Sequence, residues 1–494
     1  MKKIVYTVIL CCLMIITSCV DLVQEPQSWI TKESYIEIPQ NISQLQKAAS
    51  GLYNSFWNQN YGFSCRMLRI STSADEIVTS PKPNNVMLLI QNLTPNPTVN
   101  SADWSTMWTN MWSVITGANA LISGTKIPDD ATQAAAYKSV LGEAYFMRAL
   151  SYFYLVRLFG DVPKVLSPDD ALKVQQRKGI AAIYDEVIIP DCLNAVNSLP
   201  SKSRTGNSSA PSKWAAKTLL ADVYMTMAGW PLKRGTSYYA KSAEQTLDII
   251  SNASVAGLSL ATNYSDLWKE ARKTDANEHL FAIHNSVANK NPSQYGKSFY
   301  ARDFVPAGWA DYYGNPDFMN STPSSARKTF NYMIQWKTST GVVTWQNSMD
   351  KCPCISKYYD YDQGGPATNA LSNGLTPIYR YADVLLMYAE ASNLATNSVN
   401  PTAQKCLNDV QSRAASTVTP SNLSSSDFDQ AVLNERGWEF LAENKRWFDL
   451  VRREKLANVK PQYAGSVFQK FNTYLFPIPV DQIQLTGWTN NPGY

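Results

Sequence analysis

The chain has 494 residues, with 44 Lys and Arg against 40 Asp and Glu and a formal net charge of +4. This near balance excludes recognition of nucleic acid or of an anionic membrane by bulk electrostatics, and eight scattered cysteines argue against a disulfide-built fold. Aromatic residues make up 12 % of the chain, including 14 Trp and 27 Tyr, which is enough for both a core and flat binding surfaces.

The first residues have the features of an export signal. Two lysines precede an apolar run over residues 4–16, and two small residues then precede Cys19. This layout predicts a secretory signal peptide over residues 1–18, because the run is shorter than the roughly 20 residues of a spanning helix. Ile-Thr-Ser-Cys also resembles the bacterial lipobox, so we expect Cys19 to be acylated and to begin a mature domain of residues 19–494. The alternative is an ordinary signal peptide with an incidental cysteine.

Three tryptophans, Trp104, Trp108 and Trp112, recur every four residues and face one way if the segment is helical. The stripe could be a stacking platform or the buried side of a helix that continues to Asn119. We expect Trp108 and Trp112 to lie in the core. Trp104 differs because it stands at the start of the helix, directly after the Asn- and Pro-rich stretch at 91–100.

Helical periodicity then dominates the chain. Apolar residues at steps of three and four predict helices over 134–159, 180–199, 212–229, 379–394, 402–415 and 427–456. Gly160 ends the first of these, and Pro163 follows as a stop signal. Small residues among the aromatics allow close antiparallel packing, and the helix pairs resemble tetratricopeptide hairpins. We therefore expect a mainly α scaffold, formed chiefly by residues 104–256 and 377–460.

Two insertions, 57–100 and 257–376, are rich in Asn, Ser, Pro, Gly and aromatic residues and lack helical periodicity. Within the second, HLFAIHN (279–285) and GVVTW (341–345) fit short strands. Loops mounted on a rigid frame are where binding residues concentrate. We therefore expect the ligand-binding region in these insertions.

Signatures of catalysis are absent from the sequence. Its two histidines, His279 and His284, are five residues apart, which fits neither HExxH nor two ligands on one helical face. No GxSxG, GxxxxGK[ST] or GxGxxG occurs. The CPC stretch at 352–354 has no accompanying Cys or His pair, so we expect free thiols at a turn. A pair of glycosidase carboxylates is defined by separation in space, which the sequence leaves open. We predict no catalytic activity and no cofactor, and we assign no metal ligands, although calcium binding by loop carboxylates stays open.

Several charged residues lie on helices that are otherwise apolar. A buried charge is tolerated when it is paired and hydrogen-bonded. Glu435, Glu439 and Arg446 could form an acid/base site or an ion-pair network. We favour the network, which would join the last helices to the scaffold.

In four stretches the chain resembles the SusD/RagB-like lipoproteins, nutrient-binding outer-membrane proteins of the Bacteroidetes type. These stretches are LGEAYFMRALSYFYLVRLFGDVPKV, TPIYRYADVLLMYAEASNL, LNERGWEFLAENKRWFDLVRREKL and YLFPIPVDQIQLTGWTNNPGY. The resemblance implies four tetratricopeptide-like hairpins on one side and an irregular, loop-rich region with a few short strands on the other. It also implies a non-catalytic glycan receptor, lipid-anchored to the outer membrane and facing outward, that serves a SusC-like TonB-dependent transporter. Retention on the inner leaflet and a peptide or protein ligand remain open alternatives.

Sugars present apolar C–H faces edged by hydroxyls, so a receptor needs flat rings beside planar hydrogen-bonding groups. In the family, the region corresponding to 293–318 supplies stacking residues, and the approach to the first helix contributes to the ligand surface. The candidate ligand-contacting residues are therefore Trp309, Tyr312, Tyr295, Trp104 and Arg66. Arg69 could replace Arg66, or it could pair with Asp75 or Glu76.

Overall fold

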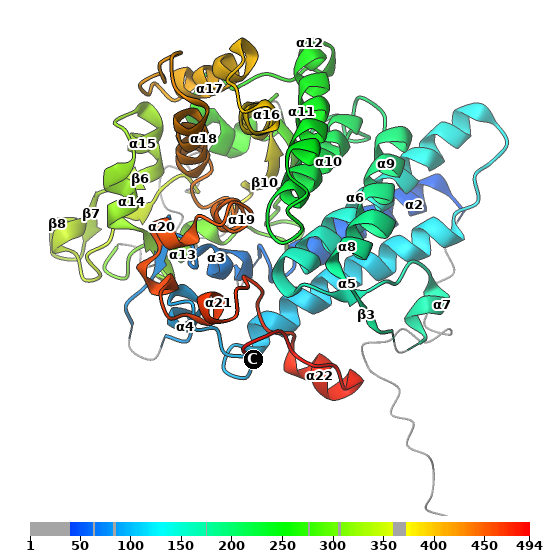
Figure 1. Ribbon diagram of the computed structural model, residues 1–494, viewed down its shortest axis with the longest axis horizontal. Helices are drawn as coiled ribbons and strands as arrows, with labels where there is room; N and C mark the ends of the chain where they lie inside the picture. The colour runs from blue at the N-terminus through cyan, green and yellow to red at the C-terminus, as the bar shows by residue number, and fades with distance from the viewer. Residues whose placement is uncertain are drawn as a thin grey trace, which may run out of the picture.

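The structure is a computed structural model, shown in Figure 1. It describes residues 40–494 except 63–64, 83–84, 174, 275–276, 305–307 and 359–371. The predicted signal segment 1–18 and Cys19 lie outside the described residues. In the described part of the chain, no helix combines the length and the apolar character needed to cross a bilayer.

Long helices build one side of the molecule. They are α2 (Ile42–Trp57), α5 (Ser101–Gly124), α6 (Ala131–Phe159), α9 (Ile189–Ser198), α10 (Lys213–Ala228), α11 (Thr236–Ser251), α16 (Tyr381–Thr396), α17 (Pro401–Arg413) and α18 (Ser425–Glu439). Each helix packs on the next from α2 to α17, in the order α2, α5, α6, α9, α10, α11, α16 and α17 (Figure 1). The helices therefore form four consecutive pairs, which confirms the predicted mainly α fold.

Local chemistry sets the ends of α6. The Asp130 side chain accepts the backbone N–H of Gln133 at the first turn, and Gly160, with φ of +76°, ends the helix. From Val140 onward α6 is buried on almost every face, because α2, α5, α9 and α10 all contact it. The helix predicted over 134–159 is thus confirmed, and its broad apolar surface reflects its central position.

Two departures from the predicted helices have physical causes. The segment predicted as one helix over 427–456 is split into α18 and α19 (Arg446–Arg452) by a turn in which Ala442 and Asn444 have positive φ. Glu443 lies in this turn, and its carboxylate forms ion pairs with the buried side chains of Lys357 and Arg380. Tyr379 belongs to a strand, β10 (Leu375–Arg380), and not to α16, because β10 pairs with the predicted strand β4 (His279–His284). Helices α2 and α11 were not predicted.

The remaining elements are short. The strands pair two by two, as β1 (Ile77–Thr79) with β5 (Tyr312–Gly314), β2 (Val162–Pro163) with β3 (Arg177–Lys178), β6 (Tyr332–Met333) with β9 (Cys354–Ile355), and β7 (Gln335–Thr338) with the predicted β8 (Gly341–Thr344). The short helices are α3 (Arg66–Ser71), α4 (Met87–Gln91), α7 (Pro168–Ala171), α8 (Ile180–Ile183), α12 (Ala253–Ala256), α13 (Tyr295–Phe299), α14 (Pro316–Ser321), α15 (Ala326–Asn331), α20 (Leu456–Val459), α21 (Val467–Lys470) and α22 (Val480–Thr486). In Figure 1, α3, α4, α13 and the β7–β8 hairpin lie on the side away from α9 and α10.

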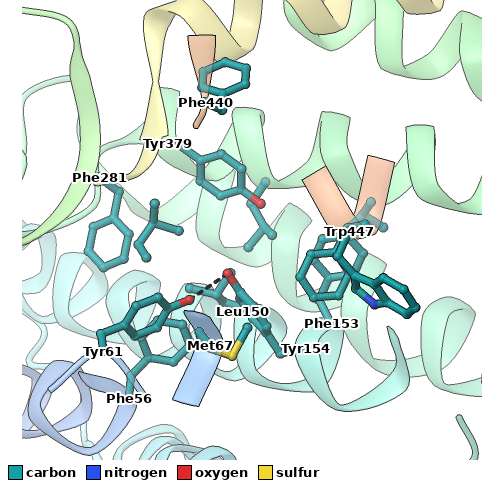
Figure 2. Close-up of a cluster of buried hydrophobic side chains, with 14 of the residues drawn as sticks. Phe56, Tyr61, Met67, Leu150, Phe153, Tyr154, Phe281, Tyr379, Phe440 and Trp447 are labelled. Carbon is teal, nitrogen blue, oxygen red and sulfur yellow. Dashed lines mark hydrogen bonds between the residues drawn. The ribbon is translucent and has the colours of Figure 1, made fainter. Parts of the chain in front are cut away.

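The main core joins both sides of the molecule. Figure 2 shows rings from the long helices, such as Phe153 and Tyr154 of α6, in one cluster with Phe281 of β4 and Tyr379 of β10. The hydroxyls of Tyr61 and Tyr154 lie 2.9 Å apart in a hydrogen bond across this core. A second, smaller cluster lies under the loops and contains Tyr300, Ala301, Phe304, Ala310, Tyr313, Trp336 and Cys354. The loop-rich side therefore has a core of its own, to which Ala310 and Tyr313 belong.

Candidate functional site

Trp309 lies where two segments of the loop-rich side meet. Its backbone N–H donates to the carbonyl of Lys297 in α13 over 3.0 Å, and its carbonyl accepts from Lys82 Nζ over 2.5 Å. The indole is partly exposed, and Lys297 Nζ lies 5.1 Å from the ring centroid. A cation at this distance is attracted to the π face of the ring. The backbone of Trp309 is thus held on both sides while part of its ring reaches the surface.

Asp311 continues this segment. Its carbonyl accepts the N–H of Ser80 and its own N–H donates to the carbonyl of Ser298, both over 3.0 Å. Burial raises the pKa of the Asp311 carboxyl, and the positive charges of Lys82 and Arg69 oppose this rise. The stretch from Trp309 to Asp311 is therefore clamped between α13 and the loop after β1.

The two arginines of α3 complete the site. Both Arg66 and Arg69 form ion pairs with the same carboxylate oxygen of Asp103, in the first turn of α5. Burial lowers the pKa of Arg66, although a guanidinium stays protonated in proteins. The alternative prediction that Arg69 pairs with Asp75 or Glu76 is wrong. Asp75 instead accepts two hydrogen bonds from Arg446, at 2.8 and 2.9 Å.

We call the group formed by Trp309, Lys82, Lys297, Asp311, Arg66, Arg69 and Asp103 the Trp309 site, in which Asp103 is buried and the other six residues are partly exposed. It combines one accessible ring with carboxylates, ammonium groups and guanidinium groups, which suits binding of a polar, ring-shaped ligand. The neighbouring thiol of Cys65 is buried, and burial raises its pKa to about 12, so it is not a nucleophile at neutral pH.

Three of the predicted stacking rings are not available to a ligand. Tyr295 and Trp104 are 0 % exposed and Tyr312 is 1 % exposed. Trp104 stacks on Phe476 with centroids 5.2 Å apart, and Tyr295 packs edge-on against Tyr358 at 5.0 Å. A ring covered by protein on both faces cannot also stack on a sugar, so the prediction for these three residues disagrees with the structure.

Sequence analysis did not single out four members of the site, namely Lys82, Lys297, Asp103 and Asp311. For Lys82 and Lys297, the sequence indicates only that they lie in the loop-rich insertions, where we expected ligand binding. Asp103 directly precedes Trp104, a residue that was chosen for its ring. Their grouping depends on contacts between distant segments, which spacing along the chain does not reveal.

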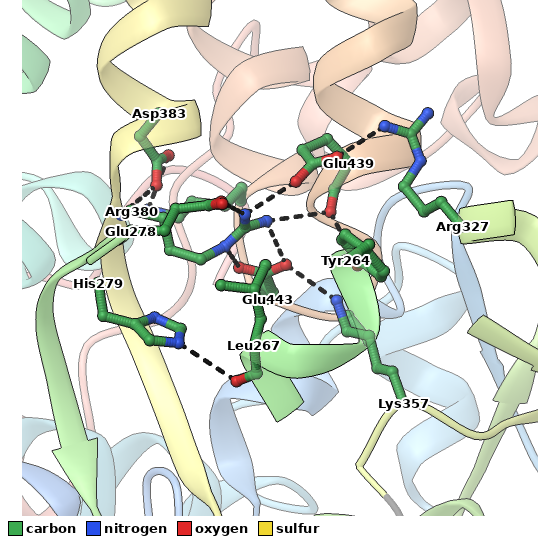
Figure 3. Close-up of polar contacts among 12 residues, drawn as sticks. Tyr264, Leu267, Glu278, His279, Arg327, Lys357, Arg380, Asp383, Glu439 and Glu443 are labelled. Carbon is green, nitrogen blue, oxygen red and sulfur yellow. Dashed lines mark hydrogen bonds and ion pairs between the residues drawn. The ribbon is translucent and has the colours of Figure 1, made fainter. Parts of the chain in front are cut away.

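A network of buried charges lies elsewhere, between the β4–β10 pair and α18 (Figure 3). We call it the buried charge network. It consists of Arg327, Lys357, Arg380, Arg413, Glu278, Glu435, Glu439 and Glu443. These side chains are 0–4 % exposed, and each carboxylate contacts at least one cation. The cluster is therefore structural, as the ion-pair hypothesis for Glu435 and Glu439 predicted, although Arg446 belongs to a separate pair.

Electrostatics within this network are strongly perturbed. Burial lowers the pKa of Lys357 to about 8, against the opposing charge of Glu443. Burial alone would raise the pKa of Glu439, but the charges of Arg413, Arg380 and Arg327 hold it at about 2. The pKa of Lys357 is thus lowered by burial and that of Glu439 by its three cationic partners, and both side chains are shielded from solvent.

A cavity of about 20 Å³ lies among polar residues of α6, α10, α16 and α19. Arg157, Asp222 and Lys445 are among the residues that line it. This volume holds about one water molecule. The cavity is too small for a sugar.

Comparison with known proteins agrees with this architecture. The model described as "SusD family" matches residues 283–494, and a model described as "Starch-binding associating with outer membrane" matches residues 26–225. The chain belongs to the SusD family. The family predicted from the four sequence stretches is thereby confirmed, and the second description associates the family with the outer membrane.

Individual relatives of this SusD-family protein align along nearly its whole length. It is 27 % identical to SusD-like protein P2 of Formosa agariphila, covering 100 % of both chains, and 28 % identical to a SusD-like protein of Bacteroides ovatus, covering 82 % of this chain and 74 % of the relative. Among solved structures, a SusD superfamily protein from Parabacteroides distasonis has a TM-score of 0.76 at 28 % identity, covering 91 % of this chain and 99 % of the other. A laminarin-binding SusD-like protein has a TM-score of 0.73 at 21 % identity, and the match covers 92 % of this chain and 100 % of the other. This likeness shows a shared fold.

Proposed function

We propose that this SusD-family protein is a glycan receptor of the outer membrane that captures oligosaccharide or polysaccharide at the Trp309 site. The observation that carries the proposal is the half-buried Trp309, whose ring lies under Lys297 and whose backbone carbonyl accepts from Lys82, a residue that also acts on the charge of Asp311. A sugar can stack its C–H face on the indole while its hydroxyls bond the charged groups at the ring edge. A laminarin-binding protein and a protein solved with a xylogluco-oligosaccharide share the fold, which supports the same ligand class here.

The proposal includes an anchor and a partner. Acylation of Cys19 would tether the domain to the outer membrane, since each buried methylene contributes about 0.8 kcal/mol. The long helices would pack against a SusC-like TonB-dependent transporter, leaving the loop-rich side to meet the ligand. No step of this function calls for a catalytic residue, so we propose a binding protein and not an enzyme.

Calorimetric titration tests the ligand class. Protein beginning at Val20 is titrated with plant, host and microbial glycans, and Trp309→Ala is compared with Trp438→Ala. Trp438 is a suitable control because it is also partly buried but lies on α18. Loss of the stacked ring should weaken binding at least about tenfold, equivalent to about 1.4 kcal/mol, whereas the control should bind as the unmodified protein does.

Two results would count against the proposal. Equal affinity of Trp309→Ala and the unmodified protein would place the ligand elsewhere. Binding of peptides in place of every glycan would favour a protein-interaction role for the same fold.

A further inference from the structure

The Trp309 site carries more positive than negative charge. Its cations are Arg66, Arg69, Lys82 and Lys297, and its anions are Asp103 and Asp311. The whole chain has only a small net charge, so this excess is a local feature. All four cationic side chains are partly buried, where charges interact more strongly than in bulk water.

The two lysines account for part of the excess. Among the described residues, neither Lys82 nor Lys297 has a carboxylate within ion-pair distance. Lys82 donates to the Trp309 carbonyl, and Lys297 lies over the Trp309 ring. Neither contact removes a net charge. The charge of Lys82 is opposed in part by Asp311, whose pKa it lowers, and Lys297 forms no ion pair within the described part of the chain.

The two arginines account for the rest. Arg66 and Arg69 converge on one oxygen of Asp103, whose other oxygen accepts from Asn100 over 3.4 Å. The Nε atoms of both arginines are buried without a hydrogen-bond partner in the described part of the chain. One carboxylate is thus shared by two guanidinium groups, which leaves this side of the site positive as well.

We propose that the site selects acidic glycans, with Lys297 and Lys82 contacting a uronate carboxylate or a sulfate ester beside the sugar stacked on Trp309. This inference rests on the proposed glycan-binding function and names its substrate class. A neutral glycan would leave the ammonium groups unneutralised in a partly desolvated site, whereas an acidic one supplies the missing charge in charge-assisted hydrogen bonds.

Matched glycan pairs separate charge from shape. Oligogalacturonate is compared with its methyl ester, and a sulfated galactan oligosaccharide with its desulfated form, by calorimetry at about 50 mM and about 500 mM NaCl. At low salt the acidic member of at least one pair should bind about tenfold more tightly than its neutral twin, and high salt should reduce this ratio. The pair that shows the preference tells whether the acid is a carboxylate or a sulfate.

Lys297→Met tests the assigned residue, because the substitution keeps the backbone carbonyl that holds Trp309. It should reduce the acid-to-neutral affinity ratio about fivefold or more, at an unchanged melting temperature. The control is Lys405→Met, since that side chain is 71 % exposed on α17 and should leave the ratio unchanged.

Equal or tighter binding of the neutral twins would overturn the inference while leaving glycan binding intact. Equal weakening of both twins by Lys297→Met would assign Lys297 to holding the indole and would also overturn it. If no acidic or neutral glycan binds, the proposed function itself fails.

Discussion

Replacing Glu439 by Gln tests how the buried charge network holds the last helices to the scaffold. The Glu439 carboxylate accepts from Arg327 and Arg380 (Figure 3). It also accepts from Arg413. The network contains equal numbers of cations and carboxylates, so it is electrically balanced. Glutamine has nearly the same shape but no charge, so Glu439→Gln leaves one buried positive charge without compensation.

The expected magnitude follows from this imbalance. Removing one partner of a buried ion pair costs about 3–5 kcal/mol. At about 2.1 cal/mol/K per residue, the unfolding entropy of a 494-residue chain is about 1 kcal/mol/K. The melting temperature should therefore fall by about 3–5 °C at neutral pH.

Thermal unfolding followed by circular dichroism at two pH values measures the effect. The pKa of Glu439 is lowered from 4.5 to about 2, so its contribution to stability is present above pH 4.5 and is lost as the pH falls toward 2. The difference in melting temperature between Glu439→Gln and the unmodified protein should therefore be smaller at low pH than at neutral pH. The control is Glu454→Gln, which removes an exposed partner of Lys233 and should cost less than about 1 kcal/mol. A change below about 1 °C in Glu439→Gln at neutral pH would refute the argument from charge balance.

Two further predictions concern stability. Burial raises the pKa of Glu76 from 4.5 to about 8, so its contribution to stability is complete below pH 4.5 and is lost as the pH rises toward 8. Glu76→Gln should therefore gain stability relative to the unmodified protein between pH 5 and 8, and melting curves showing a constant difference would contradict this. At Gly229 an added Cβ would lie 2.1 Å from the carbonyl oxygen of Arg452, so Gly229→Ala should cost about 1–3 kcal/mol in urea unfolding. Gly51→Ala, in open space on α2, should instead stabilise by about 0.5–1 kcal/mol, and equal effects of the two substitutions would contradict the steric argument.

The site was predictable by region but not by residue. The sequence directed attention to Trp309 and to Arg66 or Arg69, and the structure brings the Trp309 segment and α3 to one surface through Lys82 and Asp311. The aromatic residues nearby could not be sorted into exposed and buried from composition. A Tyr in a Gly- and Pro-rich stretch can be buried in a second core as readily as it can face solvent, as Tyr313 is.

The sequence by itself determined the fold class, the family and the position of most scaffold helices, because apolar periodicity and terminal residues such as Gly160 act within a few residues along the chain. Only the tertiary structure decided which rings and charges reach the surface. Trp104 is covered by Phe476 from the other end of the chain, and Asp103, its neighbour, forms ion pairs with two arginines that come from α3. Burial and pairing of this kind are set by segments distant in sequence, so no local pattern can encode them.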